Sequence, residues 1–137
     1  MDINLEVIKE NLEDVQSRIN TAAISAGRDP DAVHLVVVTK ALPVSHAKLA
    51  IMAGAKNLGE NYPEEGAQKI SEICNPGVTW HMIGHIQRRK TRIVAAHYDM
   101  VHSIDSLKLA VSLNNECVKM HKVMPVLLEI NVGGEES

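Results

Sequence analysis

Residues 33–40 read Val-His-Leu-Val-Val-Val-Thr-Lys, a nearly continuous run of aliphatic, mostly β-branched residues that ends in a threonine and a lysine. An unbroken run of this kind is typical of a strand buried on both faces, as in a parallel sheet covered by helices. The residues after it, from Pro43 to Ala53, have the length and composition of a helix. The stretch therefore predicts a β/α unit, with Lys40 at the point where its strand ends.

The same change from a short apolar run to a helix recurs along the chain. A helix over 2–26 precedes the first strand, and a fifth strand follows the last helix. Strands that alternate with helices of about ten or more residues imply parallel pairing through right-handed crossovers. Two architectures fit this order: an open doubly wound sheet, and part of a (β/α)₈ barrel. The strands are predicted over 33–38, 55–59, 78–82, 100–103 and 123–130, and the helices between them over 43–53, 63–73, 87–96 and 106–120.

The last predicted helix carries Leu107, Ala110, Val111 and Asn114 on one face, at helical spacing.

The composition favours a soluble protein of one domain. The chain has 137 residues, of which 45% are hydrophobic, with no Phe and one Trp, so the core should be aliphatic. The 14 Lys and Arg against 17 Asp and Glu give a net charge of −3, which offers no general attraction to nucleic acid or to an anionic membrane. Cys74 and Cys117 are isolated thiols, and no signal peptide or membrane span is evident, so a cytoplasmic location is predicted.

Lys40 is the residue whose position most suggests chemistry. Ligands of parallel α/β folds collect at the carboxyl ends of the strands, and Lys40 directly follows a strand predicted to be buried. Burial would strip water from its amine and leave it free to attack a carbonyl carbon. The alternative is a lysine that extends to solvent from a strand end. Spacing alone leaves both interpretations open.

Two other groups of residues have simpler interpretations. His81 and His85 are four residues apart, but Gly84 and the preceding strand argue against one helical face, and no further ligand lies nearby, so no metal site is predicted. The basic cluster, defined as Arg88, Arg89, Lys90 and Arg92, is expected to be a solvated face. A nucleic-acid patch is the alternative, and it lacks interleaved aromatic residues that could stack on bases.

Five motifs occur in order at the predicted strand ends, and together they resemble the pyridoxal 5'-phosphate (PLP) homeostasis protein family, also called the YggS-like or proline synthetase co-transcribed family. The resemblance covers essentially the whole chain. The motifs are Val37-Val38-Thr39-Lys40, Gly59-Glu60-Asn61-Tyr62, residues 80–90 from Trp80 to Lys90, His102-Ser103-Ile104-Asp105-Ser106, and residues 131–137 from Asn131 to Ser137.

This resemblance implies a (β/α)₈ TIM-barrel type of fold, similar to the N-terminal barrel of alanine racemase (PLP fold type III). It implies that PLP is held as a Schiff base on Lys40 by a carrier with no catalytic residues and no metal. PLP-dependent apo-enzymes are the implied recipients of the cofactor, and neither nucleic acid nor a membrane is an expected partner. The cofactor-binding residues implied at the strand ends are Lys40, Asn61, His81, Ile83, Ser103 and Asn131.

The family pattern continues beyond Ser137 with a lysine, a glycine and three more β/α units, which include the phosphate-binding part of the site. We therefore expect residues 1–137 to be a single, partial barrel domain of about five parallel strands that binds PLP weakly or not at all by itself. The whole protein is expected to be a monomer, whereas the first and fifth strands would be open edges, prone to self-association.

Two other functions stay open at this point. One is a racemase-like PLP enzyme, which needs a second acid or base on the opposite face of the cofactor ring; Tyr62 and Tyr98 are the only tyrosines. The other is an interaction module without PLP, acting through the basic cluster.

Overall fold

The computed structural model describes residues 4–134 and confirms the predicted alternation of strands and helices. A long N-terminal helix is followed by four β/α pairs and a fifth strand, with two short 3₁₀ turns at Pro30–Ala32 and Arg88–Lys90. The helices are α1 (Leu5–Ser25), α2 (Val44–Met52), α3 (Pro63–Ile73), α4 (Thr91–His97) and α5 (Leu107–Lys119), and the strands are β1 (Val37–Val38), β2 (Asn57–Glu60), β3 (Thr79–Met82), β4 (Met100–Ile104) and β5 (Val126–Leu128).

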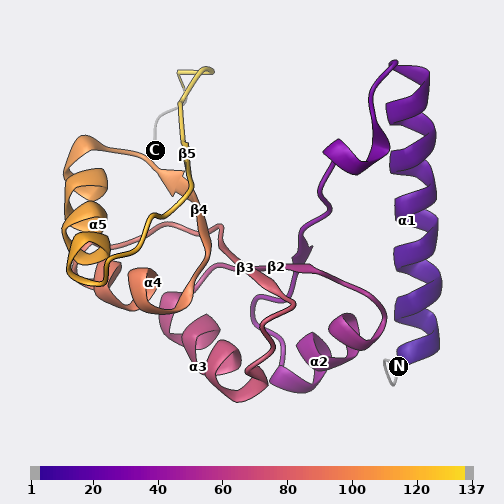
Figure 1. Cartoon of the computed structure of the whole chain (residues 1–137), viewed down its shortest axis with the longest axis horizontal. Helices are drawn as coiled ribbons and strands as arrows, with labels where there is room; N and C mark the ends of the chain where they lie inside the picture. Colours follow the sequence, from indigo (N-terminus) through magenta and orange to yellow (C-terminus); the bar gives the residue numbers. More distant parts are fainter. Residues whose placement is uncertain (1–3, 135–137) are drawn as a thin grey trace.

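The five strands form one parallel sheet in the order β1-β2-β3-β4-β5. The sheet curves into an arc, with α2 to α5 along its outer side and α1 standing beside the β1 end (Figure 1). An open doubly wound sheet reverses its strand order and carries helices on both faces. A strictly sequential order with helices on one side is the arrangement of a (β/α) barrel, so the structure decides between the two predicted architectures.

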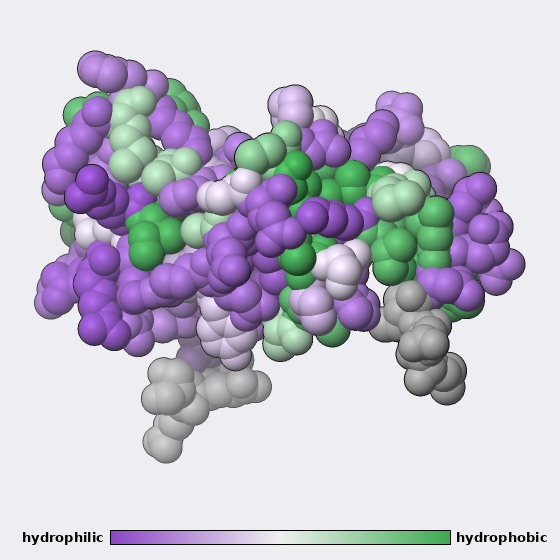
Figure 2. Space-filling model, turned by 90° about the horizontal axis from the view of Figure 1, so that it is seen from below, coloured by the Kyte–Doolittle hydropathy of each residue, from purple (hydrophilic) through white to green (hydrophobic). Residues whose placement is uncertain are grey.

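The hydrophobic core lies between the outer face of the arc and the helices. It is mostly aliphatic, as the composition predicts, and Trp80 and Tyr98 are its aromatic members. Seen from below, the outer surface of the molecule is largely hydrophilic, with hydrophobic side chains gathered in a few places (Figure 2). The largest fully buried hydrophobic side chains are Leu58, Met82, Ile86, Val94, Tyr98, Val101 and Leu109.

The first strand is shorter and less buried than predicted. Only Val37 and Val38 pair with β2, opposite Leu58 and Gly59, and the side chain of Val38 is 44% exposed. In the register of Val37 with Leu58, Val36 lies opposite Asn57, the first residue of β2. Residues 33–35 lie opposite residues 54–56, which lead from the turn at Gly54, with a φ of 106°, into β2. Residues 33–35 therefore have no strand beside them to continue the ladder, and β1 has a neighbouring strand on one side only.

The face of α5 that carries Leu107 and Val111 is not the face that packs in the core. Leu107 and Val111 are 79% and 51% exposed, whereas Leu109, Leu113 and Cys117 are buried against the sheet. The sequence of α5 is apolar on both sides, so packing selects between two possible faces that the spacing alone does not distinguish. Within residues 4–134, no helix combines the length and the apolar character needed to cross a membrane.

Candidate functional site

Three of the predicted site residues lie directly after consecutive parallel strands. Lys40 follows β1 after one intervening residue, Asn61 is the residue after β2, and Ile83 is the residue after β3. Because parallel strands end at the same edge of a sheet, these residues meet at the carboxyl edge of the arc. Asn61 and Ile83 are half-buried there, and Lys40 is exposed.

The exposure of Lys40 decides between the two interpretations of its position in favour of a lysine that extends to solvent. Lys40 stands in a tight turn in which the amide of Leu42 donates to the carbonyl of Thr39 over 3.3 Å. The third residue of this turn, Ala41, has a φ of 57°, a left-handed conformation that costs a non-glycine residue about 1 kcal/mol. The turn therefore presents the lysine to solvent in a defined, slightly strained backbone conformation.

Two glycines bring the strand ends close together. A side chain at Gly59 would lie 3.0 Å from Val36 and 3.1 Å from Ile83, so the absence of one lets these two side chains approach each other across β2. A side chain at Gly84 would overlap the backbone of Asn61, because its Cβ would lie 2.6 Å from the Asn61 Cα atom. The loop after β3 is thus packed directly onto the residue after β2.

Ser103 supports this packing from β4. Its hydroxyl is buried and donates to the carbonyl of Gly84 over 2.6 Å. In this structure the side chain therefore holds the loop after β3 in place. Its predicted contact with a cofactor stays a prediction, since the hydroxyl oxygen can still accept a hydrogen bond.

His81 lies within β3, and its ring is held by two polar partners. Its Nδ1 atom is 2.9 Å from Nε2 of His102, and its Nε2 atom is 3.2 Å from Oδ1 of Asn57. The two imidazole rings meet edge to face, with 5.1 Å between their centres. Burial, the neighbouring His102 and the more distant His34 lower the pKa of His81 against the opposing effect of Asp99, and burial lowers the pKa of His102.

This histidine pair predicts a loss of stability in acid. Because the folded pKa of each ring lies below its unfolded value of 6.5, the unfolded state binds more protons once the pH falls below about 6.5. The free energy of unfolding should fall with decreasing pH from there, by at most about 1.4 kcal/mol per pH unit for each histidine. Urea unfolding at pH 7.5 and pH 5.5 measures this loss, which should be smaller in His102→Gln and unchanged in the control His46→Gln. Equal losses in all three proteins would contradict the assignment to this pair.

The remaining predicted residues lie apart from this cluster. Asn131 follows β5 and is exposed, at the far end of the sheet from Lys40. His85 is exposed and lies 3.2 Å from Asp105, so it does not share a site with His81. Among residues 4–134, no three His, Cys, Asp or Glu side chains are arranged to hold a metal ion. In the basic cluster, Lys90 pairs with Glu64.

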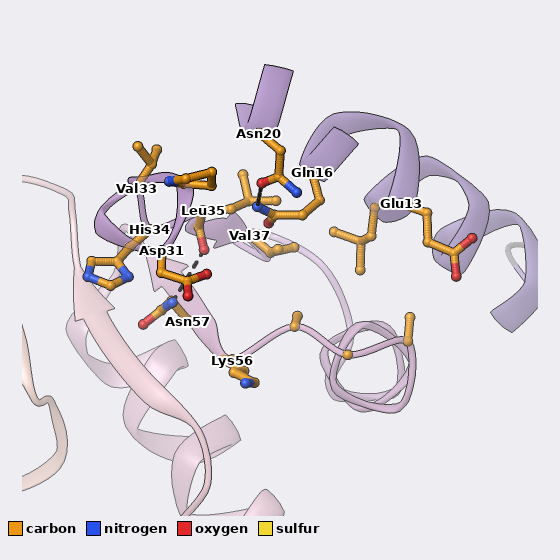
Figure 3. Close-up of a pocket in the computed structure, with 15 residues that line it drawn as sticks. Glu13, Gln16, Asn20, Asp31, Val33, His34, Leu35, Val37, Lys56 and Asn57 are labelled. Atoms are coloured by element: carbon orange, nitrogen blue, oxygen red, sulfur yellow. Dashed lines mark hydrogen bonds between the residues drawn. The ribbon is translucent and has the colours of Figure 1, made fainter. Parts of the chain in front are cut away.

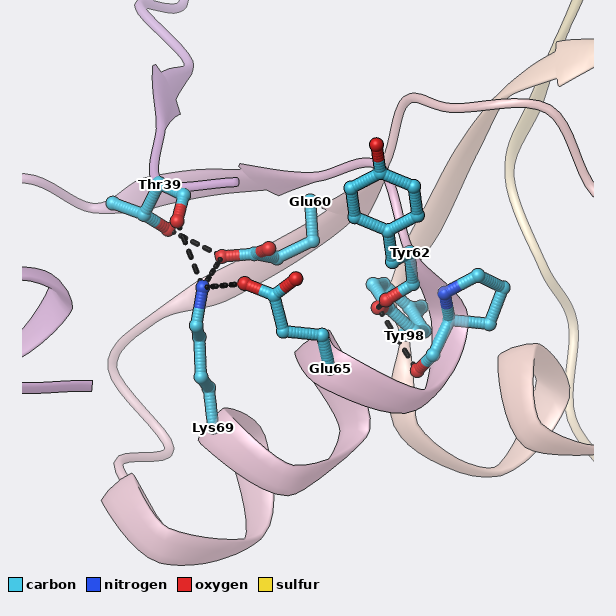
Figure 4. A network of polar contacts seen from close by, with 7 residues as sticks. Thr39, Glu60, Tyr62, Glu65, Lys69 and Tyr98 are labelled. Carbon is cyan, nitrogen blue, oxygen red and sulfur yellow. Dashed lines mark hydrogen bonds and ion pairs between the residues drawn. The ribbon is translucent and has the colours of Figure 1, made fainter. Parts of the chain in front are cut away.

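Sequence reasoning gave no role to a buried polar network that includes Thr39, the residue before Lys40. Figure 4 shows this network between Thr39, Glu60, Glu65 and Lys69. The ammonium group of Lys69 on α3 donates to Glu60 over 2.9 Å, to Glu65 over 2.7 Å and to the carbonyl of Thr39 over 2.8 Å. The hydroxyl of Thr39 also donates to Glu60 over 2.6 Å. The four-residue spacing of Glu65 and Lys69 on a helix is the one signal in the sequence that fits an ion pair, and it says nothing about burial.

Tyr98 lies close enough to this network for the charges of Glu60 and Glu65 to act on it. It is fully buried, and its hydroxyl donates to the carbonyls of Tyr62 and Pro63, 3.3 Å away in each case. Burial and the negative charges of Glu60 and Glu65 raise its pKa well above the ordinary range of a tyrosine. The phenol therefore stays protonated and acts as a hydrogen-bond donor in the core.

One pocket of the described chain lies away from the carboxyl edge. It has a volume of about 710 Å³ and lies between α1 and the segment that leads into β1, near the amino ends of the strands (Figure 3). Glu13, Gln16 and Asn20 line it from α1, and Asn57 lines it from β2. Lys40 is not among its lining residues. Ligands of parallel α/β folds bind at the opposite edge, so we assign the candidate site to the carboxyl ends.

Comparison with known proteins relates this arrangement to a described family. A model of the family described as alanine racemase, N-terminal domain, matches residues 3–137. Pyridoxal phosphate homeostasis proteins of Pseudomonas aeruginosa and of Escherichia coli strain K12 are each 41% identical over 133 residues. The matches cover 97% and 95% of this chain but 58% and 57% of those proteins, so the chain spans less than two thirds of their length.

Two solved structures share the fold. PipY of Synechococcus elongatus PCC7942, determined with PLP bound, superimposes with a TM-score of 0.79 at 29% identity, covering 91% of this chain and 55% of PipY. An unknown protein from Bifidobacterium adolescentis gives a TM-score of 0.84 at 30% identity, covering 100% of this chain and 60% of that protein. These likenesses confirm the predicted TIM-barrel type of fold, of which the five strands form a part.

Proposed function

Because the chain belongs to the alanine racemase N-terminal domain family, we propose that the protein binds PLP as a Schiff base on Lys40 and acts in PLP homeostasis. The observation that carries the proposal is the position of Lys40, an exposed primary amine in a fixed turn at the carboxyl edge of the arc. The names of the relatives and the PLP bound to PipY support it. Since the chain covers 58% of the first of these relatives, the activity of the whole protein is part of the proposal.

The residues at the carboxyl edge fit PLP chemically. PLP supplies an aldehyde, and the amine nitrogen of Lys40 can bond to its carbon with release of one water molecule. Asn61 is half-buried and offers an amide for a hydrogen bond to the cofactor ring, and Ile83 offers an apolar wall. We also assign contacts with the cofactor to His81, Ser103 and Asn131, as the family resemblance implies.

We further propose that the protein carries PLP without turning over a substrate. A racemase needs an acid or base that can change protonation on the second face of the ring. Tyr98 is a poor candidate, because its hydroxyl is buried among backbone acceptors and its pKa is raised. Tyr62 is 57% exposed, and no described side chain fixes it in place for such a role within residues 4–134. These features favour a carrier over the racemase-like alternative.

The cellular setting belongs to the same proposal. We assign the protein to the cytoplasm, as a single barrel domain that acts as a monomer and passes PLP to PLP-dependent apo-enzymes. The exposed hydrophobic side chains of Val126, Leu127 and Leu128 on β5 support the view that this edge is covered in the working protein.

Replacing Lys40 with alanine is expected to abolish the visible absorbance band of the imine when the full-length protein is titrated with PLP. Borohydride reduction followed by peptide mass spectrometry should place the cofactor on Lys40 in the wild type. Lys56→Ala removes another exposed lysine, at the amino edge of β2, and should keep the band. A band that persists in Lys40→Ala would refute the assignment.

A second experiment tests whether the protein is a carrier without turnover. In deuterium oxide, the loaded protein should leave the α-carbon of L-alanine unlabelled, and steady exchange would instead favour the racemase-like alternative.

A further inference from the structure

Thr39, the residue directly before Lys40, is bonded through every one of its polar groups. Its amide donates to the carbonyl of Gly59 over 3.0 Å, and its hydroxyl donates to Glu60 over 2.6 Å. Its carbonyl accepts a hydrogen bond from Lys69 over 2.8 Å. The residue is 3% exposed, so water does not compete for these bonds. Thr39 is thereby anchored by its amide, its hydroxyl and its carbonyl, although it lies just beyond the end of β1.

The bond from Lys69 acts on Lys40 through the backbone. The carbonyl of Thr39 and the amide nitrogen of Lys40 belong to the same planar peptide group, so fixing one fixes the other. The side chain of Thr39 points toward the helical layer, where α3 supplies Lys69 (Figure 4), and the chain enters its tight turn at Lys40, directly after this anchored residue.

The buried network around Glu60 and Lys69 is not explained by a contribution to stability alone. The side chain of Glu60 is 0% exposed and that of Lys69 is 5% exposed, and Oε2 of Glu60 has no hydrogen-bond partner. Two buried charges with an unsatisfied oxygen stabilise a fold no better than well-packed apolar side chains of the same volume. Such a pair does fix the positions of the groups that it bonds, because a buried ammonium or carboxylate group has few other hydrogen-bond partners within reach.

We propose that Glu60, Lys69 and Thr39 are positioning residues that aim Lys40 at the PLP aldehyde. Glu60 orients Lys69 and the hydroxyl of Thr39, and Lys69 locks the Thr39–Lys40 peptide group. The left-handed Ala41 on the other side of Lys40 completes the fixed turn. This inference rests on the proposed function, since it concerns the lysine to which PLP binds.

The test compares two ligands that differ only at the reacting atom. PLP can bond to Lys40, whereas pyridoxamine 5'-phosphate carries an amine in place of the aldehyde and binds without a covalent bond. Damage to the pocket as a whole weakens both ligands, but misdirection of Lys40 weakens PLP alone. Dissociation constants for both are measured with the full-length protein, by imine absorbance for PLP and by calorimetry for pyridoxamine 5'-phosphate.

Thr39→Val keeps the shape of the side chain and removes the hydroxyl. We expect its affinity for PLP to fall by about tenfold, the order of one hydrogen bond to a charged group, with pyridoxamine 5'-phosphate unchanged within about twofold. Thr39→Ser restores the hydroxyl and should restore the affinity for PLP. Glu72→Gln breaks the exposed pair between Lys48 and Glu72, which faces solvent on the same helix as Lys69, and should change neither constant.

The outcomes separate this inference from the proposed function. Equal weakening of both ligands in Thr39→Val, or no weakening of PLP, overturns the positioning role while PLP binding on Lys40 stands. A wild-type protein that forms no imine on Lys40 overturns both. If Thr39→Val does not fold, Thr39→Ala leaves room for water to reach Glu60 and carries the same expectations for the two ligands.

Discussion

Replacing Lys69 with methionine is expected to lower the free energy of unfolding by about 3–5 kcal/mol, because it leaves the buried carboxylate of Glu60 without its counter-charge. Glu60 is 0% exposed, and one of its oxygens already lacks a partner. The variant also removes a donor from the carbonyl of Thr39. Of the two carboxylates that contact Lys69, Glu65 loses less stabilisation than Glu60, because its side chain is 34% exposed and can turn to water. Equilibrium unfolding in urea, followed by far-UV circular dichroism, measures the loss.

Two further variants show whether burial is the cause. Lys48→Met breaks the pair between Lys48 and Glu72, whose side chains are each 47% exposed, and should cost no more than about 1 kcal/mol. The double variant Glu60→Gln/Lys69→Met removes both buried charges and should recover at least half of the loss. A cost for Lys69→Met no larger than that for Lys48→Met would show that the buried pair contributes nothing beyond an exposed one.

The order of elements could be predicted from the sequence because each strand is short, apolar and followed by a helix. The extent of the edge strands could not. Val33, His34 and Leu35 belong to the predicted strand, but they lie opposite residues 54–56, which lead from a turn at Gly54 into β2. Pairing depends on two segments, whereas the hydrophobic pattern belongs to one of them. The buried face of α5 could not be chosen from its spacing for a related reason, because the packing of α5 is set by the sheet beneath it.

The candidate site was predictable to the level of strand ends. A parallel sheet brings the residues after each strand to one edge, so Lys40, Asn61 and Ile83 follow from the order of elements. The contact between His81 and His102 depends on the register of β3 and β4, which the sequence does not encode locally. The buried network was hidden because charged residues are usually exposed, and composition offers no sign of the exception.

Gly84→Ala is expected to damage the carboxyl edge strongly although it adds only one methyl group. The new Cβ would overlap the carbonyl oxygen of Asn61 and would lie 2.6 Å and 2.8 Å from its Cα and carbonyl carbon. Backbone atoms cannot rotate away as a side chain can, so the loop after β3 and the end of β2 must separate. The cost should reach about 3 kcal/mol, at the upper end for overpacked sites.

The separation should also disturb the edge where Lys40 lies. Moving the loop pulls the carbonyl of Gly84 from the hydroxyl of Ser103, a buried hydrogen bond of 2.6 Å, and shifts Asn61. Gly77→Ala provides the control, because its Cβ would meet only the flexible side chain of Asn75 at 3.2 Å in an exposed turn, and its cost should stay within about 0.5 kcal/mol. Urea unfolding of both variants measures the difference. Similar free energies of unfolding for Gly84→Ala and Gly77→Ala would contradict the close backbone contact between Gly84 and Asn61.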